Sequence, residues 1–271
     1  MGSVLVAVAV AVLVIDQRLD PWYPFLFLVV LGLSLAACFE LLGLLGPERR
    51  PPAWLCYTAV AGLVVANWCA HVLPTGGDPW HWVLGTFTAV TVSAFLTEMA
   101  VFREPGYSVV RIALAVWIAA YVGLLPSFLM QLRWLGGDRG TAALALTIFV
   151  PKCGDIGAYF TGRFLGRHRM TPVLSPKKTW EGLAGGLATA VAAAAGINYL
   201  GPAPLLAGVP AVVGFGITVG LAGVLGDLAE SLIKRDCGQK DASQAVPGFG
   251  GVLDVVDAIL FAAPVAYLWL R

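Results

Sequence analysis

Long apolar runs separated by short polar segments occupy almost the whole 271-residue chain. A helix needs roughly 20 apolar residues to cross a bilayer, so runs of about that length between charges, prolines and glycine clusters indicate spans. Nine such runs occur, at approximately residues 3–15, 22–45, 53–72, 82–102, 109–132, 141–160, 182–200, 205–233 and 252–270. The first is short and the eighth is long. The pattern predicts an all-α fold, a polytopic transmembrane bundle of about nine helices.

Composition supports this interpretation. Hydrophobic residues make up 59% of the chain and charged residues only 12%, whereas a soluble domain carries about a quarter charged residues. The formal net charge of +1 gives no bias toward nucleic acid, which we therefore exclude as a partner. The few charges are more informative by position than by sum.

The basic residues are distributed unevenly between the predicted loops. Eleven lie in the even-numbered loops, namely Arg49, Arg50, Arg103, Arg163, Arg167, Arg169, Lys177, Lys178, Lys234, Arg235 and Lys240. The odd-numbered loops and the C-terminus hold four. Because cytoplasmic loops are enriched in Lys and Arg, we expect the two most polar loops, 161–180 and 234–251, to face the cytoplasm.

Charges within the predicted spans are concentrated in the second half of the chain. Spans after residue 150 contain or adjoin Lys152, Asp155, Glu181, Asp227, Glu230, Asp254 and Asp257. A charge at membrane depth is costly unless it is paired or faces a polar cavity, so such a cluster indicates a functional site. We therefore expect an N-terminal transmembrane region at 1–150 and a catalytic transmembrane region with cytoplasmic loops at 151–271.

The segment SPKKTWEG, residues 175–182, combines a helix start with two lysines. Thr179, followed by Glu181, is typical of a helix N-cap. Lys177 and Lys178 then lie at a helix N-terminus, where backbone N–H groups and the helix dipole favour an anion such as a polyphosphate. An ordinary positively charged cytoplasmic loop is an equal alternative from this segment alone.

The segment GDLAESLIKRDCGQKD, residues 226–241, predicts a polar helix face. Helical spacing places Asp227, Glu230, Ser231 and Lys234 on one side of the helix. Such a stripe would meet a polar surface rather than lipid. A structural salt bridge from Lys234 to one of the two carboxylates is the alternative.

The segment PGFGGVLDVVDA, residues 247–258, combines a permissive turn with two carboxylates three residues apart. Asp254 and Asp257 can point the same way on a helix, and a divalent cation would relieve their repulsion. Oxygen ligands without a neighbouring His or Cys favour Mg²⁺ over Zn²⁺. Alternatively, one aspartate caps the helix and the other pairs with a lysine. Lys152 and Asp155, also three apart, could simply neutralise each other.

Together, these motifs resemble those of the phosphatidate cytidylyltransferase (CDP-diglyceride synthase) family. The family pattern S-x-x-K-R-x4-K-D, followed by P-G-H-G-G-x-x-D-R-x-D, appears here as SLIKR, KD and PGFGGVLDVVD, residues 231–257. The upstream patterns D-x-x-A-Y-x-x-G and S-P-K-K-T-x-E-G match residues 155–162 and 175–182. The resemblance covers roughly residues 152–271.

The resemblance implies Mg²⁺-dependent transfer of CMP from CTP to phosphatidate, giving CDP-diacylglycerol and pyrophosphate. We expect Asp227 and Asp254 to bind the metal, and Asp257, Asp241 and Lys240 to complete the catalytic set. The substrate-binding residues expected are Asp155, Ser175, Lys177, Lys178, Thr179, Ser231, Lys234 and Arg235. A monovalent cation could accompany Mg²⁺, and we expect a homodimer in the inner membrane with its site facing the cytoplasm.

Two positions depart from the family pattern. Phe249 stands where the family has His, and Val255 stands where it has Arg, so a divergent, inactive paralogue is one alternative. A related CTP-dependent enzyme or kinase acting on an isoprenoid lipid would use the same carboxylates. A cation-coupled transporter would predict inverted hydropathy repeats, which the confinement of charges to one half does not support.

Overall fold

The computed structural model describes residues 14–73, 77–239, 243 and 250–271. Within these residues, eight helices are long and apolar enough to cross a membrane. They coincide with eight of the nine predicted spans, and the all-α membrane fold is confirmed. The first predicted span, 3–15, lies largely outside the described residues.

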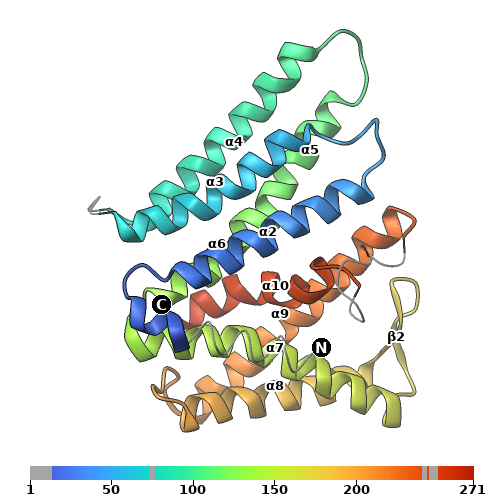
Figure 1. Ribbon diagram of the computed structural model, residues 1–271. Helices are drawn as coiled ribbons and strands as arrows, with labels where there is room; N and C mark the ends of the chain where they lie inside the picture. Colours follow the sequence, from blue (N-terminus) through green and yellow to red (C-terminus); the bar gives the residue numbers. More distant parts are fainter. Residues whose placement is uncertain (1–13, 74–76, 240–242, 244–249) are drawn as a thin grey trace. The chain divides into compact units, whose positions relative to one another are not determined.

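Figure 1 shows the helices in the order in which they follow one another along the chain. Their bounds are α2 (Pro24–Leu44), α3 (Ala53–Val72), α4 (Pro79–Val101), α5 (Ser108–Ala119), α6 (Leu125–Arg133), α7 (Gly137–Leu165), α8 (Trp180–Leu200), α9 (Gly208–Asp236) and α10 (Leu253–Leu270). A 3-10 turn, η1 (Gln17–Leu19), precedes α2, and the π-helical segment η2 (Ala120–Leu124) joins α5 to α6. As predicted, residues 108–133 therefore form one span.

The chain divides into two compact units. The first comprises Met1–Met130 and Asp241–Leu253, and the second comprises Gln131–Lys240 and Asp254–Arg271. The boundary predicted at residue 150 separates the N-terminal transmembrane region from the catalytic region, and it stays a prediction.

The first unit packs α3 against α4 and α5 around an apolar core of Ala59, Leu63, Val83, Val90 and Ala119. A salt bridge joins α4 to α5, because the Arg111 guanidinium donates to both carboxylate oxygens of buried Glu98 at 2.8 and 2.7 Å. This geometry satisfies a charge that would otherwise be costly within the membrane.

The second unit brings helix backbones close together through glycines. A Cβ on Gly186 of α8 would lie 2.9 Å from the carbonyl oxygen of Gly154 in α7, and one on Gly216 of α9 would lie 2.6 Å from Cα of Val191 in α8. Small residues at helix contacts allow this approach. These glycines therefore let α7, α8 and α9 pack closely.

A short antiparallel hairpin, β1 (Arg169–Thr171) and β2 (Ser175–Thr179), connects α7 to α8 (Figure 1). Thr179 caps α8 as predicted, because its hydroxyl accepts a hydrogen bond from the Gly182 amide at 3.1 Å. Glu181 fastens the base of the hairpin, since one of its carboxylate oxygens accepts from the Arg167 and His168 amides at 3.1 and 3.2 Å. These bonds fix the lysine-bearing strand β2 relative to α8.

Candidate active site

Helix α9 continues to Asp236 and carries the polar stripe predicted for its last turns. Asp227, Glu230 and Lys234 lie along one face, and the Ser231 hydroxyl donates to Asp227 at 3.5 Å. Glu230 is only 2% exposed, so this stripe packs against protein rather than lipid.

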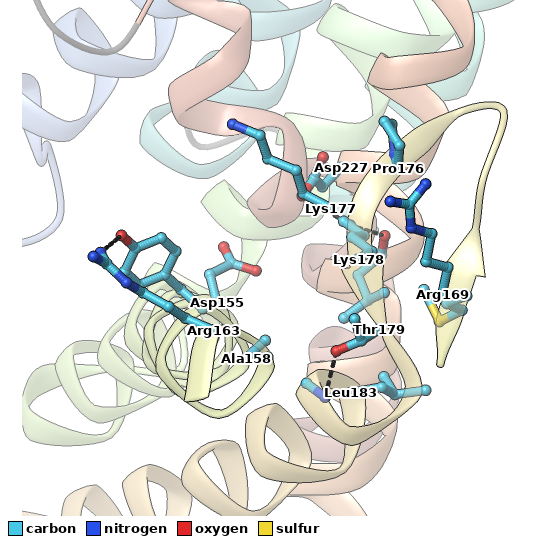
Figure 2. A pocket seen from close by; sticks show the side chains of 15 residues that line it. Asp155, Ala158, Arg163, Arg169, Pro176, Lys177, Lys178, Thr179, Leu183 and Asp227 are labelled. Atoms are coloured by element: carbon cyan, nitrogen blue, oxygen red, sulfur yellow. Dashed lines mark hydrogen bonds and ion pairs between the residues drawn. The ribbon is translucent and has the colours of Figure 1, made fainter. Parts of the chain in front are cut away.

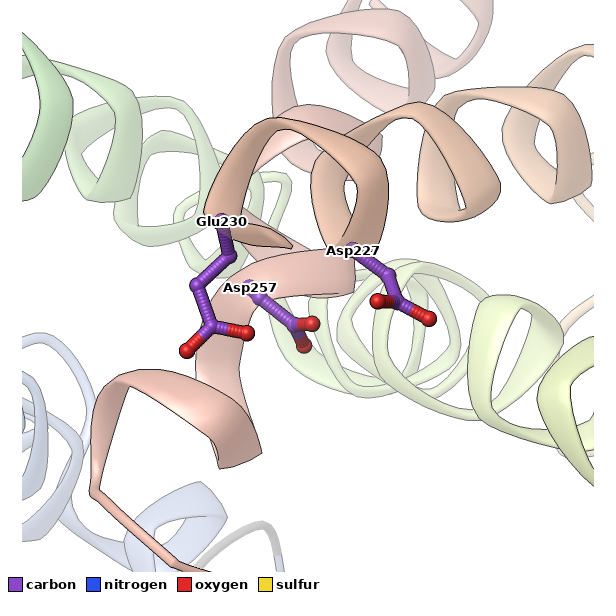
Figure 3. Close-up of side chains that lie close together, drawn as sticks. All are labelled: Asp227, Glu230 and Asp257. Atoms are coloured by element: carbon purple, nitrogen blue, oxygen red, sulfur yellow. The ribbon is translucent and has the colours of Figure 1, made fainter. Parts of the chain in front are cut away.

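Asp257 of α10 joins Asp227 and Glu230 of α9 in a group of three carboxylates (Figure 3). One oxygen from each lies within 4.8 Å of the others. Glu230 and Asp257 are buried, and Glu230 Oε1 has no hydrogen-bond partner among the described residues. A buried carboxylate oxygen without a donor is costly, whereas a bound divalent cation would satisfy it. The donor set therefore fits such a cation.

Gly226 allows α9 to approach α10 closely enough to form this group. A Cβ at position 226 would collide with the carbonyl oxygen of Asp257 and would lie 3.1 Å from Cα of Ala258. Because both neighbours are backbone atoms, no side-chain rotation could relieve the collision.

Three lysines surround the carboxylates. The ion pairs are Lys152 with Asp257 (3.4 Å) and Asp155 (3.7 Å), Lys178 with Asp227 (2.8 Å), and Lys234 with Glu230 (3.1 Å) and Asp254 (2.6 Å). Among the residues that the structure describes, five carboxylates thus lie against three ammonium groups. A divalent cation would add positive charge to this acidic group.

The salt bridges considered as alternatives from the sequence are present, but they belong to a larger network. Lys234 bridges Glu230 to Asp254, and Lys152 bridges Asp155 to Asp257. Asp254 therefore faces Lys234 rather than the three-carboxylate group. Its predicted role as a metal ligand stays a prediction.

A cavity of about 560 Å³ lies between α7, the hairpin, α8 and α9 (Figure 2). Four cationic side chains line it, namely Arg163, Arg169, Lys177 and Lys178. Asp155 and Asp227 provide the acidic side of its wall. The volume is within the range of small-molecule sites, and the cations suit a polyanion.

Most predicted site residues lie at the cavity or the carboxylate cluster. Asp155, Lys177, Lys178, Thr179 and Asp227 line the cavity. Ser231, Lys234, Asp254 and Asp257 belong to the polar network beside it.

Two predicted residues that the structure describes lie outside both the cavity lining and the polar network beside it. Ser175 pairs with Thr171 in the hairpin, and exposed Arg235 donates to the Gln239 carbonyl oxygen at 3.2 Å. Lys240, Asp241 and the unusual Phe249 lie outside the described residues, whereas Val255 is half-buried on α10.

The structure adds Glu230, Lys152, Arg163 and Arg169 to the predicted site. Glu230 and Lys152 stand out in the sequence as charges within apolar spans, but only the fold shows that Glu230 belongs to the group of three carboxylates and that Lys152 contacts it. The two arginines had counted only toward the loop charge. The hairpin brings Arg169 to the cavity, and Arg163 reaches it from the last turn of α7.

Comparison with known proteins gives a consistent result. The family model described as "Cytidylyltransferase family" matches residues 1–271. A phosphatidate cytidylyltransferase of Staphylococcus aureus (strain COL) is 30% identical over 215 residues, covering 79% of this chain and 80% of that protein. One of Brucella suis biovar 1 (strain 1330) is 39% identical over 155 residues, 56% of each chain. This chain therefore belongs to the cytidylyltransferase family.

Proposed function

We propose that this protein transfers CMP from CTP to phosphatidate, producing CDP-diacylglycerol and pyrophosphate. The observation that carries the proposal is the position of Asp227, which both lines the cationic cavity and belongs to the three-carboxylate group. A polyphosphate in the cavity would thus lie beside a cation held by the carboxylates. The names of the Staphylococcus and Brucella relatives support the same reaction.

The reaction is a displacement at phosphorus. An oxygen of the phosphatidate phosphate forms a bond to the α-phosphorus of CTP, and the bond from that phosphorus to the bridging oxygen breaks, so pyrophosphate leaves with the electron pair. A phosphomonoester is already ionised near neutral pH, so no general base is needed. Catalysis is therefore mostly positioning and charge neutralisation.

The chain's own cations perform the neutralisation. Lys177 and Lys178 on β2 and Arg163 on α7 line the cavity from two sides and would bind the triphosphate oxygens. Arg169, on β1, adds a fourth positive charge at the same wall. Pyrophosphate takes the electron pair of the broken phosphorus–oxygen bond, and its negative charge would be stabilised by this cationic surface until it leaves.

We assign the metal as Mg²⁺, because the donors are carboxylate oxygens. Asp227, Glu230 and Asp257 would hold it, and it would stabilise negative charge on the transferring phosphoryl group. In this assignment Asp254 orients Lys234, which in turn contacts Glu230. Asp254 is then a supporting residue, in place of the ligand role predicted from sequence.

We place the site at the cytoplasmic side of the cell membrane. Lys178, which precedes α8, contacts Asp227 near the end of α9, so the hairpin and the C-terminal part of α9 lie at one end of the second unit, where loop charge predicts the cytoplasm. CTP is water-soluble and phosphatidate lies in the leaflet, which suits a site at this interface. The expected homodimer stays a prediction.

The test is an assay of the purified, detergent-solubilised chain with radiolabelled CTP, Mg²⁺ and a panel of lipid acceptors. We expect labelled CDP-diacylglycerol only with phosphatidate and only with a divalent cation present. Labelling of a polyprenyl phosphate in preference to phosphatidate, or no labelled lipid at all, would contradict the proposal.

A Lys178→Met variant should bind CTP more weakly. Hydrogen bonds to charged groups contribute about 1.5–3 kcal/mol, so we expect kcat/KM for CTP to fall roughly 10- to 100-fold, mainly through KM. Arg235→Met is the matched control, because Arg235 is basic and close in sequence to the site but does not line the cavity. Equal losses in the two variants would show that general surface charge, not the cavity, recruits the nucleotide.

A further inference from the structure

Glu40, a glutamate near the C-terminal end of the apolar helix α2, is 3% exposed and accepts three hydrogen bonds from one distant segment. Its Oε1 accepts from the Val252 amide at 2.8 Å and from the Ser243 hydroxyl at 2.5 Å, and its Oε2 accepts from the Leu253 amide at 2.8 Å. All four residues belong to the first unit. Three donors, with at least one on each carboxylate oxygen, hold this side chain in one position.

The two amides are those at the beginning of α10. The first N–H groups of a helix have no partner within the helix, and a carboxylate placed there satisfies them and interacts favourably with the helix dipole. Glu40, which is more than 200 positions earlier in the chain, therefore acts as the cap of the helix that carries Asp257.

Gly251 leaves the space that this contact needs. A Cβ at position 251 would lie 2.5 Å from Glu40 Oε2 and 2.9 Å from its Cδ. From the sequence, Gly251 belongs to a turn that its glycines make permissive. In the structure, the group that approaches it is the Glu40 carboxylate.

We propose that Glu40 is a positioning residue for the carboxylate cluster, an inference that rests on the proposed function. It fixes the amides of Val252 and Leu253, and the chain then passes directly into Asp254 and, one turn later, Asp257. Glu40 thus stabilises the N-terminal turns of α10, the helix on which Asp257 lies. Glu40 touches no reacting atom and acts only through α10.

The test is a Glu40→Gln variant, assayed by hydrogen exchange and by Mg²⁺ titration of activity. Glutamine offers one oxygen for two amides, and its NH₂ group would oppose the other amide. We expect faster exchange at residues 252–253. Loss of a group that supports metal ligands costs about 10- to 100-fold in metal affinity or activity, so half-maximal activity should need correspondingly more Mg²⁺.

Glu98→Gln is the matched control, since Glu98 is also a buried glutamate of the first unit but pairs with Arg111. It should lower thermal stability without changing exchange at 252–253 or the Mg²⁺ requirement. Gly251→Ala disturbs the same contact while keeping the Glu40 charge. It should reproduce both effects expected for Glu40→Gln, and it serves as the second test if Glu40→Gln folds poorly.

The outcomes separate the two proposals. Unchanged exchange at 252–253, or faster exchange with an unchanged Mg²⁺ requirement, would overturn the positioning role. A wild-type chain that makes no CDP-diacylglycerol would overturn the proposed function instead, and the exchange measurement would still report on the cap.

Discussion

An Asp257→Asn variant is expected to form CDP-diacylglycerol roughly 10²- to 10³-fold more slowly than the unmodified chain, the loss typical of removing one preorganised electrostatic group. Asp257 is 5% exposed and lies between the α9 carboxylates and Lys152. Asparagine keeps the shape of the side chain but removes its charge, which leaves a weaker metal ligand. The Lys152 ammonium group also loses its carboxylate partner on α10. The rate with saturating CTP and phosphatidate measures the effect.

Asp254→Asn provides the comparison on the same helix. Asp254 contacts Lys234 at 2.6 Å and is not one of the three grouped carboxylates. We expect a smaller loss of about 10-fold, comparable to removal of a group that orients a ligand. A loss for Asp254→Asn that equals or exceeds that for Asp257→Asn would restore the ligand assignment made from the sequence and exclude the one made from the geometry.

Replacing Gly226 by alanine should destabilise the protein and inactivate it. The added Cβ would collide with the Asp257 carbonyl oxygen, and overpacking of this kind costs typically about 1–3 kcal/mol. To accept the methyl group, α9 and α10 must move apart, and that movement separates Asp227 from Asp257. We expect a lower midpoint of thermal inactivation in detergent. We also expect a loss of activity that is much larger than the loss of folded protein accounts for.

Gly196→Ala, near the C-terminal end of α8, is the matched control. Nothing lies within 4 Å of a Cβ at that position, and alanine is a better helix former than glycine by about 1 kcal/mol. We therefore expect unchanged activity and unchanged or slightly higher thermal stability. If Gly226→Ala behaves like Gly196→Ala, the close α9–α10 contact is not what assembles the site.

The helices were predictable because the membrane imposes a minimum length on every apolar run. Residues 53–72 agree to the residue, and 22–45 and 109–132 differ from the observed helices by one or two positions at each end. The Thr179 cap and the polar face of α9 were also predictable, because both depend on local spacing along one helix.

The arrangement of the site was less predictable, because it depends on contacts between helices. Periodicity shows that Asp254 and Asp257 can share a face of α10, but it does not say which of them meets α9. Gly226 decides this, since the close contact forms at the Asp257 carbonyl. The hairpin escaped prediction because its strands have only three and five residues, one with Pro176 inside it.

The role of Glu40 could not be inferred from local sequence for the same reason. Its partners, Val252 and Leu253, are more than 200 positions away, and within its own helix it is a single acid in an apolar run. A buried charge signals that a partner exists but does not identify it.

The ion pair between Lys178 and Asp227 has a consequence for the order of binding. The two groups are 2.8 Å apart, so each neutralises the other as long as the cavity holds no polyanion. A triphosphate competes with Asp227 for this ammonium group, and the carboxylate it releases is one of the three donors suited to a divalent cation. Nucleotide and cation are therefore expected to be heterotropic partners. Binding of either one should raise the protein's affinity for the other by the same factor.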